Sequence, residues 1–271
     1  MECAAGRLNT NKAPHETRQA DHRSHGADAM TPQPYFEAQG ITLYCGDCRE
    51  ILPHLGHVDH IITDPPYSRR THDGHNASSS GHTWGGGNDG SERLGLGYQW
   101  LDERDCRIYS ELFHASCGGW IVWMTDHSLA PIIMGELECG GRYVFAPLPF
   151  FAPGSRVRLS GDGPSSWTDW IIVSRTTAQA RWGTLPGGYV SGQGPEWHDK
   201  QWIGGKPSAL MGKLVRDYSR DGEIVCDPFM GAGTTVVAAR NSGRRAIGID
   251  ISEEACAIAA GRLRQGVLLG V

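Results

Sequence analysis

Two kinds of apolar spacing alternate along residues 41–264 and predict an α/β protein. Largely apolar runs, typical of buried strands, occupy 41–45, 58–63, 120–124, 143–147, 170–174, 223–227 and 245–250. Apolar residues three or four positions apart, which predict helices with one buried face, occupy 101–116, 129–137, 210–218, 235–241 and 253–264. Because strands and helices alternate over most of the chain, the pattern favours a sheet covered by helices.

The tetrapeptide Asp64-Pro65-Pro66-Tyr67 directly follows the strand predicted at 58–63. A carboxylate, a backbone carbonyl and an aromatic ring at one point suit a planar base with an exocyclic amino group. Asp64 and the Pro65 carbonyl can each accept one N–H of that amine. Tyr67 can stack on the ring face, and Pro66 keeps the turn rigid. Holding both N–H groups turns the nitrogen lone pair toward an electrophile. The alternative interpretation of the tetrapeptide is a rigid turn on the protein surface.

A glycine-rich segment, Asp227 to Thr235, lies between a predicted strand and the helix predicted at 235–241. This position is typical of a loop that binds a cofactor. The loop is not of the dinucleotide type, because Val236 stands where that pattern requires a third small residue. Asp250 ends the next predicted strand, where an acid in doubly wound sheets binds ribose hydroxyls. The alternative for Asp250 is a charge that stabilises a helix N-terminus.

These motifs resemble those of the β group of DNA amino-methyltransferases, in which Asp-Pro-Pro-Tyr precedes the cofactor loop. The resemblance covers residues 40–265 and includes Gly46-Asp47 and Lys206-Pro207. It implies a seven-stranded, mostly parallel sheet flanked by helices, which is a Rossmann-like methyltransferase fold with a circularly permuted order of motifs. It also implies S-adenosylmethionine as the cofactor. By resemblance, Asp64 at the first motif position favours N6 of adenine over N4 of cytosine.

The resemblance further implies which residues bind the cofactor. The implied set is Asp47, Asp64, Lys206, Asp227, Phe229, Gly231, Gly233, Thr234, Thr235 and Asp250. Asp47 is expected to accept from the adenine amino group of the cofactor; the alternative is a cap for a helix over 49–55. The strand at 41–45 is expected to lie beside the strand that ends in Asp250, which requires only that the termini of the domain lie close together.

The expected activity is that of a site-specific, S-adenosylmethionine-dependent DNA (adenine-N6) methyltransferase of the restriction-modification type. The target adenine must leave the double-stranded DNA, because its N6 amine is otherwise paired. The expected catalytic residues are Asp64, Pro65, Pro66 and Tyr67. No metal is expected, because a sulfonium is already a potent methyl donor. The alternatives are N4-cytosine methylation by the same geometry and a catalytically silent DNA-binding module.

Length and composition fit one methyltransferase domain over 35–271. The chain has 271 residues, of which 39% are hydrophobic and 20% charged, and this is ordinary globular composition. Residues 1–34 are polar without periodicity and predict a disordered arm, so Met30 is a candidate for the true start. Residues 68–98 contain eight glycines and predict a flexible loop that folds over the target strand.

Residues 176–204 predict a small target-recognition insert. It carries Arg181, Trp182, Tyr189 and Trp197. Aromatic rings beside arginine can stack on bases, although buried tryptophan is the commoner arrangement.

The printed sequence has neither a run of 18 apolar residues nor the apolar stretch of a signal peptide. We therefore expect a cytoplasmic protein without membrane contact, encoded by a prokaryote or a phage. The eight cysteines are scattered, and Cys45 and Cys48 have no second close pair to complete a zinc site, so reduced thiols are expected.

The formal net charge of −5 is unevenly distributed, because residues 142–220 carry +5 and the remainder −10. The asymmetry predicts a basic face for a polyanion; an ordinary solvated surface is the alternative. The residues expected to contact DNA are Arg69, Arg70, Arg156, Arg158 and Arg181. A homodimer would enlarge the small footprint of one chain, and β-group relatives are often dimers.

Overall fold

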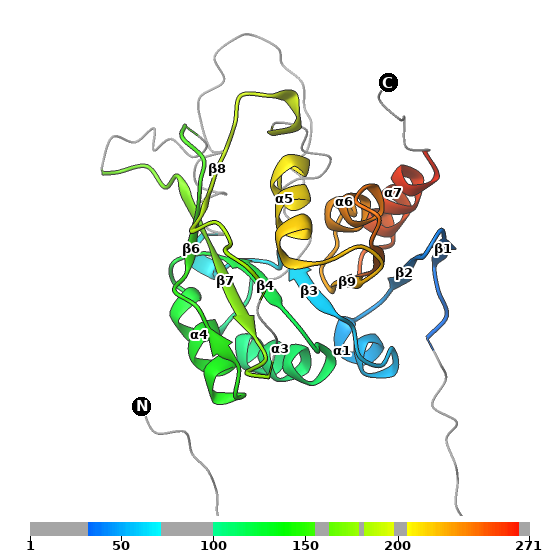
Figure 1. Ribbon diagram of the computed structural model, residues 1–271, viewed down its shortest axis with the longest axis horizontal. Coiled ribbons are helices and arrows are strands. Elements are labelled where there is room, and N and C mark those ends of the chain that lie inside the picture. The colour runs from blue at the N-terminus through cyan, green and yellow to red at the C-terminus, as the bar shows by residue number, and fades with distance from the viewer. Residues whose placement is uncertain (1–31, 72–99, 155–162, 179–181, 198–204, 266–271) are drawn as a thin grey trace, which may run out of the picture.

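One sheet of ten strands forms the centre of the protein (Figure 1). The structure is a computed structural model that describes residues 32–71, 100–154, 163–178, 182–197 and 205–265. The strand order is β1-β2-β10-β9-β3-β4-β7-β6-β8, and β5 pairs with β7. The strands are β1 (Phe36–Ala38), β2 (Ile41–Cys45), β3 (His60–Thr63), β4 (Ile121–Thr125), β5 (Tyr143–Val144), β6 (Leu148–Phe151), β7 (Thr168–Arg175), β8 (Tyr189–Val190), β9 (Ile224–Asp227) and β10 (Arg245–Asp250).

The five central strands, β2, β10, β9, β3 and β4, are all parallel. Their carboxyl ends therefore lie along one edge of the sheet, whereas β7 runs antiparallel to β4 and β1 antiparallel to β2. The prediction that the strand at 41–45 lies beside the strand ending in Asp250 is confirmed, since Cys45 is paired with Asp250. The large, mostly parallel sheet expected from the sequence is present.

The predicted number of seven strands is too low for the described residues. The run predicted at 143–147 is a strand only over Tyr143–Val144, and β6 begins after Pro147, which has no N–H to give to a strand ladder. The strands β1 and β8 have three and two residues, too few for a periodic apolar signal.

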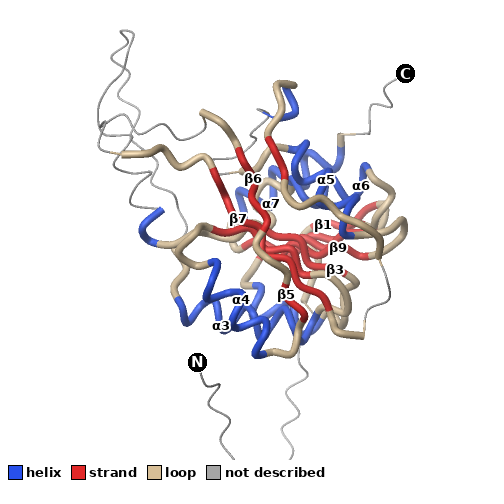
Figure 2. Tube along the Cα trace, turned by 60° about the vertical axis from the view of Figure 1, so that its left-hand side comes forward, coloured by secondary structure: helices blue, strands red, loops and turns tan. Residues whose placement is uncertain are grey.

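Helices cover both faces of the sheet, which gives three layers (Figure 2). One face carries α1, the 3-10 helix η1, α3 and α4, and the other carries α5, α6 and α7. A second 3-10 helix, η2, precedes α5. Their bounds are α1 (Cys48–Ile51), η1 (Leu52–His54), α3 (Glu103–Ser116), α4 (Ala130–Cys139), η2 (Pro195–Trp197), α5 (Ser208–Tyr218), α6 (Thr234–Asn241) and α7 (Glu253–Arg264).

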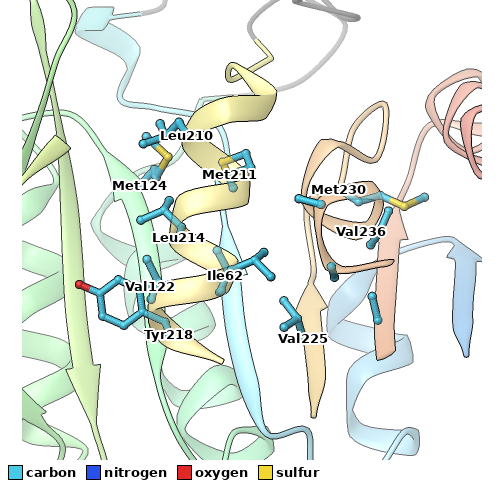
Figure 3. Packing of buried hydrophobic residues seen from close by; sticks show 14 of the residues in the cluster. Ile62, Val122, Met124, Leu210, Met211, Leu214, Tyr218, Val225, Met230 and Val236 are labelled. Carbon is cyan, nitrogen blue, oxygen red and sulfur yellow. The ribbon is translucent and has the colours of Figure 1, made fainter. Parts of the chain in front are cut away.

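The central strands are apolar throughout because each buries both of its faces. In β3, Ile61 belongs to the core under α3 and α4, whereas Ile62 belongs to the core under α5. Figure 3 shows the second core, where Leu210 of α5 lies beside Met124 of β4, and Leu214 lies near Ile62 and near Val122 of β4. Burial on both faces explains why these runs are continuous rather than alternating.

The chain changes direction across the sheet between β3 and β9, which are neighbours. From β3 it passes through α3 on one face to β4, and from β9 it passes through α6 on the opposite face to β10 (Figure 1). Open α/β sheets bind ligands in the crevice outside the carboxyl ends of the strands at such a switch point. The fold thus selects the ends of β3 and β9 as the place to look for a site.

Candidate active site

Carboxylates follow all five parallel strands at their carboxyl edge. Asp64 comes directly after β3, and Asp227 and Asp250 are the last residues of β9 and β10. Asp47 follows β2, and Asp126 follows β4. The parallel register therefore brings Asp64 and the Asp227 loop to the switch point.

The Asp64-Pro65-Pro66-Tyr67 turn is held against a lysine from a distant part of the chain. The Nζ atom of Lys206 lies 3.0 Å from Oδ1 of Asp64 and 4.5 Å from the centroid of the Tyr67 ring. The side chains of Lys206 and Asp64 are only 12% and 18% exposed. The structure thus brings the Lys206-Pro207 motif to the Asp64–Tyr67 turn. The ammonium of Lys206 contacts the carboxylate and the ring that were expected to bind the base.

Burial dominates the ionisation of Asp64. It raises the pKa of this carboxyl, and the ammonium of Lys206 opposes the rise. The negative charge of Asp169 raises the pKa further, and the hydroxyl of Tyr67 lowers it. The pKa of Asp64 therefore depends on Lys206, Asp169 and Tyr67, the groups that face it.

Asp227 is the most deeply buried carboxylate of the site, with 2% of its surface exposed. It accepts hydrogen bonds from the Thr63 hydroxyl at 2.7 Å and from the Phe229 N–H at 3.1 Å. Burial raises its pKa to about 7, against the hydrogen bonds from Thr235 and Thr63, which lower it. Since Thr63 immediately precedes Asp64, its bond to Asp227 connects the ends of β3 and β9 across the switch point.

The loop after Asp227 is shaped by two glycines with positive φ. Gly231 has φ +51° and Gly233 has φ +77°, a conformation that residues with a Cβ rarely adopt. A Cβ added at Gly231 would meet nothing within 4 Å, whereas one at Gly233 would lie 2.8 Å from Cβ of Ala259. The first glycine leaves open space beside the loop, and the second allows α6 to approach α7.

Asp250 connects this loop to the next helix. It accepts hydrogen bonds from the N–H of Gly231 at 2.8 Å and of Ser252 at 2.9 Å, and burial raises its pKa. Asp250 therefore contacts both the glycine loop and the residue that caps α7, and its role toward a ribose stays a prediction. Its side chain remains partly exposed.

Phe229, Thr234 and Thr235, which are also predicted to bind the cofactor, belong to the same loop. The rings of Phe229 and Tyr109 meet edge to face, with 5.0 Å between their centroids, and Thr235 is buried. Thr234 and the Ala232 carbonyl accept from the guanidinium of Arg262, at 3.2 and 2.6 Å. Arg262 was not singled out from the sequence, because its partner lies 28 residues away in α6.

Asp47 caps a short helix. It accepts from the Arg49 N–H at 2.8 Å and pairs with the guanidinium of Arg49, which lowers the pKa of Asp47. The alternative interpretation of Asp47 as a helix cap is therefore present in the structure, although the helix α1 ends at Ile51 and η1 continues it. Gly46 donates its N–H to the Asp250 carbonyl at 2.9 Å, so Asp47 lies next to the Asp250 strand.

Two buried carboxylates near the tetrapeptide were not predicted from the sequence. Asp126 accepts from the N–H and the hydroxyl of Ser68, and from the Thr71 hydroxyl at 2.6 Å. The Tyr67 carbonyl accepts from the N–H of Leu101 at 3.1 Å. Asp126 therefore fixes the chain that leaves Tyr67, and its position just after a strand was the signal available in the sequence.

Asp169, the second of these carboxylates, lies 3.6 Å from Nζ of Lys206 through its Oδ2 atom. It is the second residue of β7, which runs antiparallel to β4, so the start of β7 lies beside the carboxyl end of β4. A single aspartate at the start of a predicted strand gave no signal of this role.

The residues expected to contact DNA are only partly described. Arg69 and Arg70 are exposed immediately after the tetrapeptide, and the Arg69 guanidinium lies 5.8 Å from the ring centroid of Trp100. Three further arginines lie outside the described residues: Arg156, Arg158 and Arg181. So do residues 1–31 of the expected arm and residues 72–98 of the expected loop.

The described part of the expected insert at 176–204 packs into the protein. Tyr189 and Trp197 are buried, and the Tyr189 hydroxyl donates to Asp217 at 2.7 Å. Trp182 donates through Nε1 to the Asp217 carbonyl at 2.7 Å. Tyr189 and Trp197 therefore follow the buried alternative, whereas Trp182 is only partly buried.

Comparison with known proteins identifies the family. A family model described as DNA methylase matches residues 175–261. The type II methyltransferase M1.MboII of Moraxella bovis is 33% identical, over 73% of this chain and 85% of that protein. The chain belongs to the DNA methylase family. This confirms the resemblance inferred from the motifs and identifies the homologues as type II DNA methyltransferases of the N6/N4 class.

Other matches of this methylase are shorter or concern the fold. The orphan methyltransferase M.BamHII of Bacillus amyloliquefaciens is 43% identical, but the match covers 23% of this chain and 24% of that protein. The crystal structure of an M1.HpyAVI complex with S-adenosylmethionine matches with a TM-score of 0.59 and 22% identity, over 82% of this chain and 98% of that one. The cytosine-N4-specific PvuII DNA methyltransferase matches with a TM-score of 0.64 and 13% identity, over 88% and 91%.

The part of the methylase that the structure describes has neither a membrane-spanning helix nor a cluster of metal ligands. No helix there has the length and apolar character needed to cross a membrane. Within the same ranges, no three histidine, cysteine or acidic side chains are grouped as ligands for a metal ion.

Proposed function

We propose that this methylase transfers a methyl group from S-adenosylmethionine to the N6 amino group of an adenine flipped out of double-stranded DNA. The observation that carries the proposal is the meeting of the Asp64–Tyr67 turn with the Asp227 loop at the switch point of the sheet. One motif provides groups for a planar amine, and the other provides a loop suited to a nucleoside. Family membership supports the same pairing.

The residues around the loop fit S-adenosylmethionine. The open space at Gly231 lets a ligand approach the backbone, and the Asp250 carboxylate beside it suits ribose hydroxyls. Asp47, two residues after the end of the neighbouring strand β2, is the proposed acceptor for the adenine amino group of the ligand. When bound, this molecule supplies a methyl group on a positively charged sulfur. The pairing of β10 with β2, a strand from the N-terminal side, supports the proposed circular permutation of the motif order.

The tetrapeptide prepares the base for reaction. Asp64 and the Pro65 carbonyl accept the two N–H groups of the amine, and Tyr67 stacks on the ring. The nitrogen lone pair then forms the new N–C bond as the S–C bond breaks, with the pair of the broken bond remaining on sulfur. The extra proton then passes from the nitrogen to solvent water. Proximity and orientation provide most of the acceleration, because the donor is already reactive.

N4-cytosine methylation is the second candidate, because the cytosine-N4-specific PvuII enzyme shares the fold. Both bases present an exocyclic amine to the same groups. Asp64 favours adenine through the family resemblance alone.

The test is the identity of the modified base. Double-stranded DNA from methylation-deficient cells that express the full chain is digested to nucleosides and analysed by mass spectrometry. We expect N6-methyldeoxyadenosine with the wild-type chain. If N4-methyldeoxycytidine appears instead, the target base is cytosine and not adenine. If neither modified nucleoside appears, the result supports the catalytically silent DNA-binding module.

The Asp64→Ala variant tests the role of the carboxylate. We expect turnover to fall by about 100-fold or more, because the lost acceptor acts on the reacting amine. Affinity for S-adenosylmethionine should stay within a few-fold, since the main cofactor loop is untouched. Turnover above about one per cent of wild type would contradict the role of Asp64.

Thermal unfolding tests the cofactor separately. A ligand that binds only the folded chain stabilises it, by about 2.7 kcal/mol at a hundredfold excess over its dissociation constant. S-adenosylmethionine should raise the Tm, NADH should not, and Asp250→Ala should weaken the effect. Light scattering on the same samples, with and without DNA, tests the proposed homodimer.

A further inference from the structure

Lys206 contacts two carboxylates and an aromatic ring at once. Its Nζ atom lies 3.0 Å from Asp64 Oδ1, 3.6 Å from Asp169 Oδ2 and 4.5 Å from the centroid of the Tyr67 ring. The side chains of Lys206, Asp64 and Asp169 are 12%, 18% and 8% exposed. Buried charges are costly unless they remain paired, so the positions of these three groups depend on one another.

The ammonium of Lys206 lies where the target amine is proposed to bind. Both groups present N–H donors to a carboxylate, and Oδ1 of Asp64 already faces the ammonium. The ammonium also lies over the face of Tyr67, at a distance where a stacked ring would stand. The base and the ammonium therefore compete for the same carboxylate and the same ring face.

We propose that Lys206 holds the target-amine site before the base enters, and that Asp169 is the positioning residue that takes its ammonium as the base arrives. This inference rests on the proposed function and names a step that precedes it. Lys206 keeps Asp64 paired while the amine is absent. When the amine reaches Asp64, the ammonium exchanges one carboxylate for the other, and no buried charge is left unpaired.

Asp169 is within easy reach of the ammonium. Its Oδ2 is already 3.6 Å from Nζ, and a charge-assisted hydrogen bond forms at about 2.8 Å, so a small shift brings Nζ into contact with Asp169, and a further turn of the lysine stem takes it off Asp64 and the Tyr67 ring. The four-carbon stem of lysine allows this shift without a change in the backbone. Asp169 itself is fixed by the sheet, since β7 pairs with β4 on one side and with β6 on the other.

The decisive variant is Asp169→Asn, which keeps the shape of the side chain and removes its charge. Without the second carboxylate, Lys206 stays on Asp64, and the base must displace it at greater cost. At saturating S-adenosylmethionine we expect kcat/KM for DNA to fall about tenfold or more, mainly through KM. Replacing the lysine as well, in Asp169→Asn with Lys206→Met, should restore part of the loss, because no ammonium then competes with the base.

A pH profile gives a second readout that a purely structural role would not change. The charged and titratable groups that face Asp64 are Lys206, Asp169, Tyr67 and Asp227. Since the charge of Asp169 raises the pKa of Asp64, its removal should move the acid limb of kcat/KM for DNA to lower pH. The conservative variant Asp169→Glu should leave that limb near its wild-type position.

The matched control is Asp221→Asn, which removes an exposed carboxylate that pairs with Arg244 outside the site. If the wild-type chain transfers no methyl group, the proposed function fails. If the wild-type chain is active and Asp169→Asn has an unchanged KM for DNA, this inference alone fails. It also fails if the double variant is no faster than Asp169→Asn and the acid limb does not move. If Asp169→Asn does not fold, the single variant Lys206→Met tests the inference. Without the competing ammonium, its KM for DNA should be equal to or below that of the wild type, and a higher KM would contradict the inference.

Discussion

At the residue scale, two aspartates at neighbouring strand ends have different surroundings. Asp64 faces an ammonium, whereas Asp227 accepts hydrogen bonds from neutral groups such as the Thr63 hydroxyl and the Phe229 N–H. Neutral donors compensate a buried charge less than a cation does, so burial raises the pKa of Asp227 to about 7. Burial also raises the pKa of Asp64, but the ammonium of Lys206 opposes that rise, so the two carboxylates on adjacent strands have different electrostatic surroundings.

The raised pKa of Asp227 makes stability depend on pH. In the unfolded chain this carboxyl titrates near 3.8, and in the folded chain near 7, so between these values only the folded chain keeps the proton. Stability that is fully present below pH 3.8 is thus lost as the pH rises through about 7. Asp227→Asn removes the titration, and its stability relative to wild type should increase from pH 5 to pH 8, by up to about 1.4 kcal/mol for each pH unit between the two pKa values.

Denaturant unfolding of both chains at several pH values measures this difference. The control is Asp221→Asn, whose side chain is 86% exposed in the folded chain. Parallel stability curves for wild type and Asp227→Asn would show that Asp227 is ionised in both states. Comparing differences across pH cancels the constant effect of replacing a carboxylate by an amide.

The site residues that the sequence could predict are those inside contiguous motifs. Asp64 and Tyr67 stand together in one tetrapeptide, and Asp227 opens one loop, so each motif can be recognised within a short stretch of sequence. Asp169 and Lys206 meet only because β7 folds back along β4 and α5 lies over the sheet. A single aspartate and a single lysine have no pattern of their own, and resemblance indicated Lys206 but not its partner.

At the element scale, the approach of α6 to α7 depends on one glycine. Gly233 is the N-cap of α6 with φ +77°, and its missing side chain leaves room for Ala259 of α7. Gly233→Ala should destabilise the protein by about 2 kcal/mol or more, through the left-handed conformation and the contact at 2.8 Å. Thermal or denaturant unfolding measures the loss.

A glycine on the partner helix provides the control. Gly261 lies within α7, and a Cβ there would meet nothing within 4 Å. Gly261→Ala should be neutral or stabilise by about 0.5–1 kcal/mol, because alanine favours a helix. Equal losses in the two variants would mean that the close approach of α6 to α7 has no special part in stability.

The elements predicted correctly are those with a strong apolar period. The strands β3, β4, β9 and β10 bury both faces and appear as continuous runs in the sequence. The strands β6 and β8 lie beyond β7 at one end of the sheet. Pro149 weakens the apolar pattern of β6, and β8 has only two residues. Their place is determined by pairing with β7 and with each other, which a window of local sequence does not contain.

At the scale of the whole molecule, the location of the site depends on strand order. The sequence places carboxylates after strands, but only the order β10-β9-β3-β4 shows that the connections leave β3 and β9 in opposite directions. The crevice at this point collects groups that lie more than 160 residues apart in the chain, as the bond from Thr63 to Asp227 illustrates. The tetrapeptide and the cofactor loop become one site only through this topology.

The same edge of the sheet is where DNA must approach if Asp64 receives a flipped base. Arg69 and Arg70 are exposed two and three residues after Tyr67 and are the described arginines expected to contact phosphate. Each phosphate that a cation neutralises releases counterions, which makes affinity fall with salt. Changing both to alanine should therefore weaken DNA binding and flatten the slope of log K against log salt by about two units. Affinity for S-adenosylmethionine should be unchanged.

The matched control replaces the same charge at the opposite edge. Arg216 lies in the last turn of α5, and Arg245 is the first residue of β10, so both are on the side of the strand amino ends. Because this side faces away from Asp64, Arg216→Ala with Arg245→Ala should lower DNA affinity only through the net charge and leave the salt slope near its wild-type value. Equal slopes in the two double variants would contradict contact of Arg69 and Arg70 with DNA. The slope that remains without Arg69 and Arg70 then measures the cations elsewhere in the chain, among which Arg156, Arg158 and Arg181 are the proposed contributors.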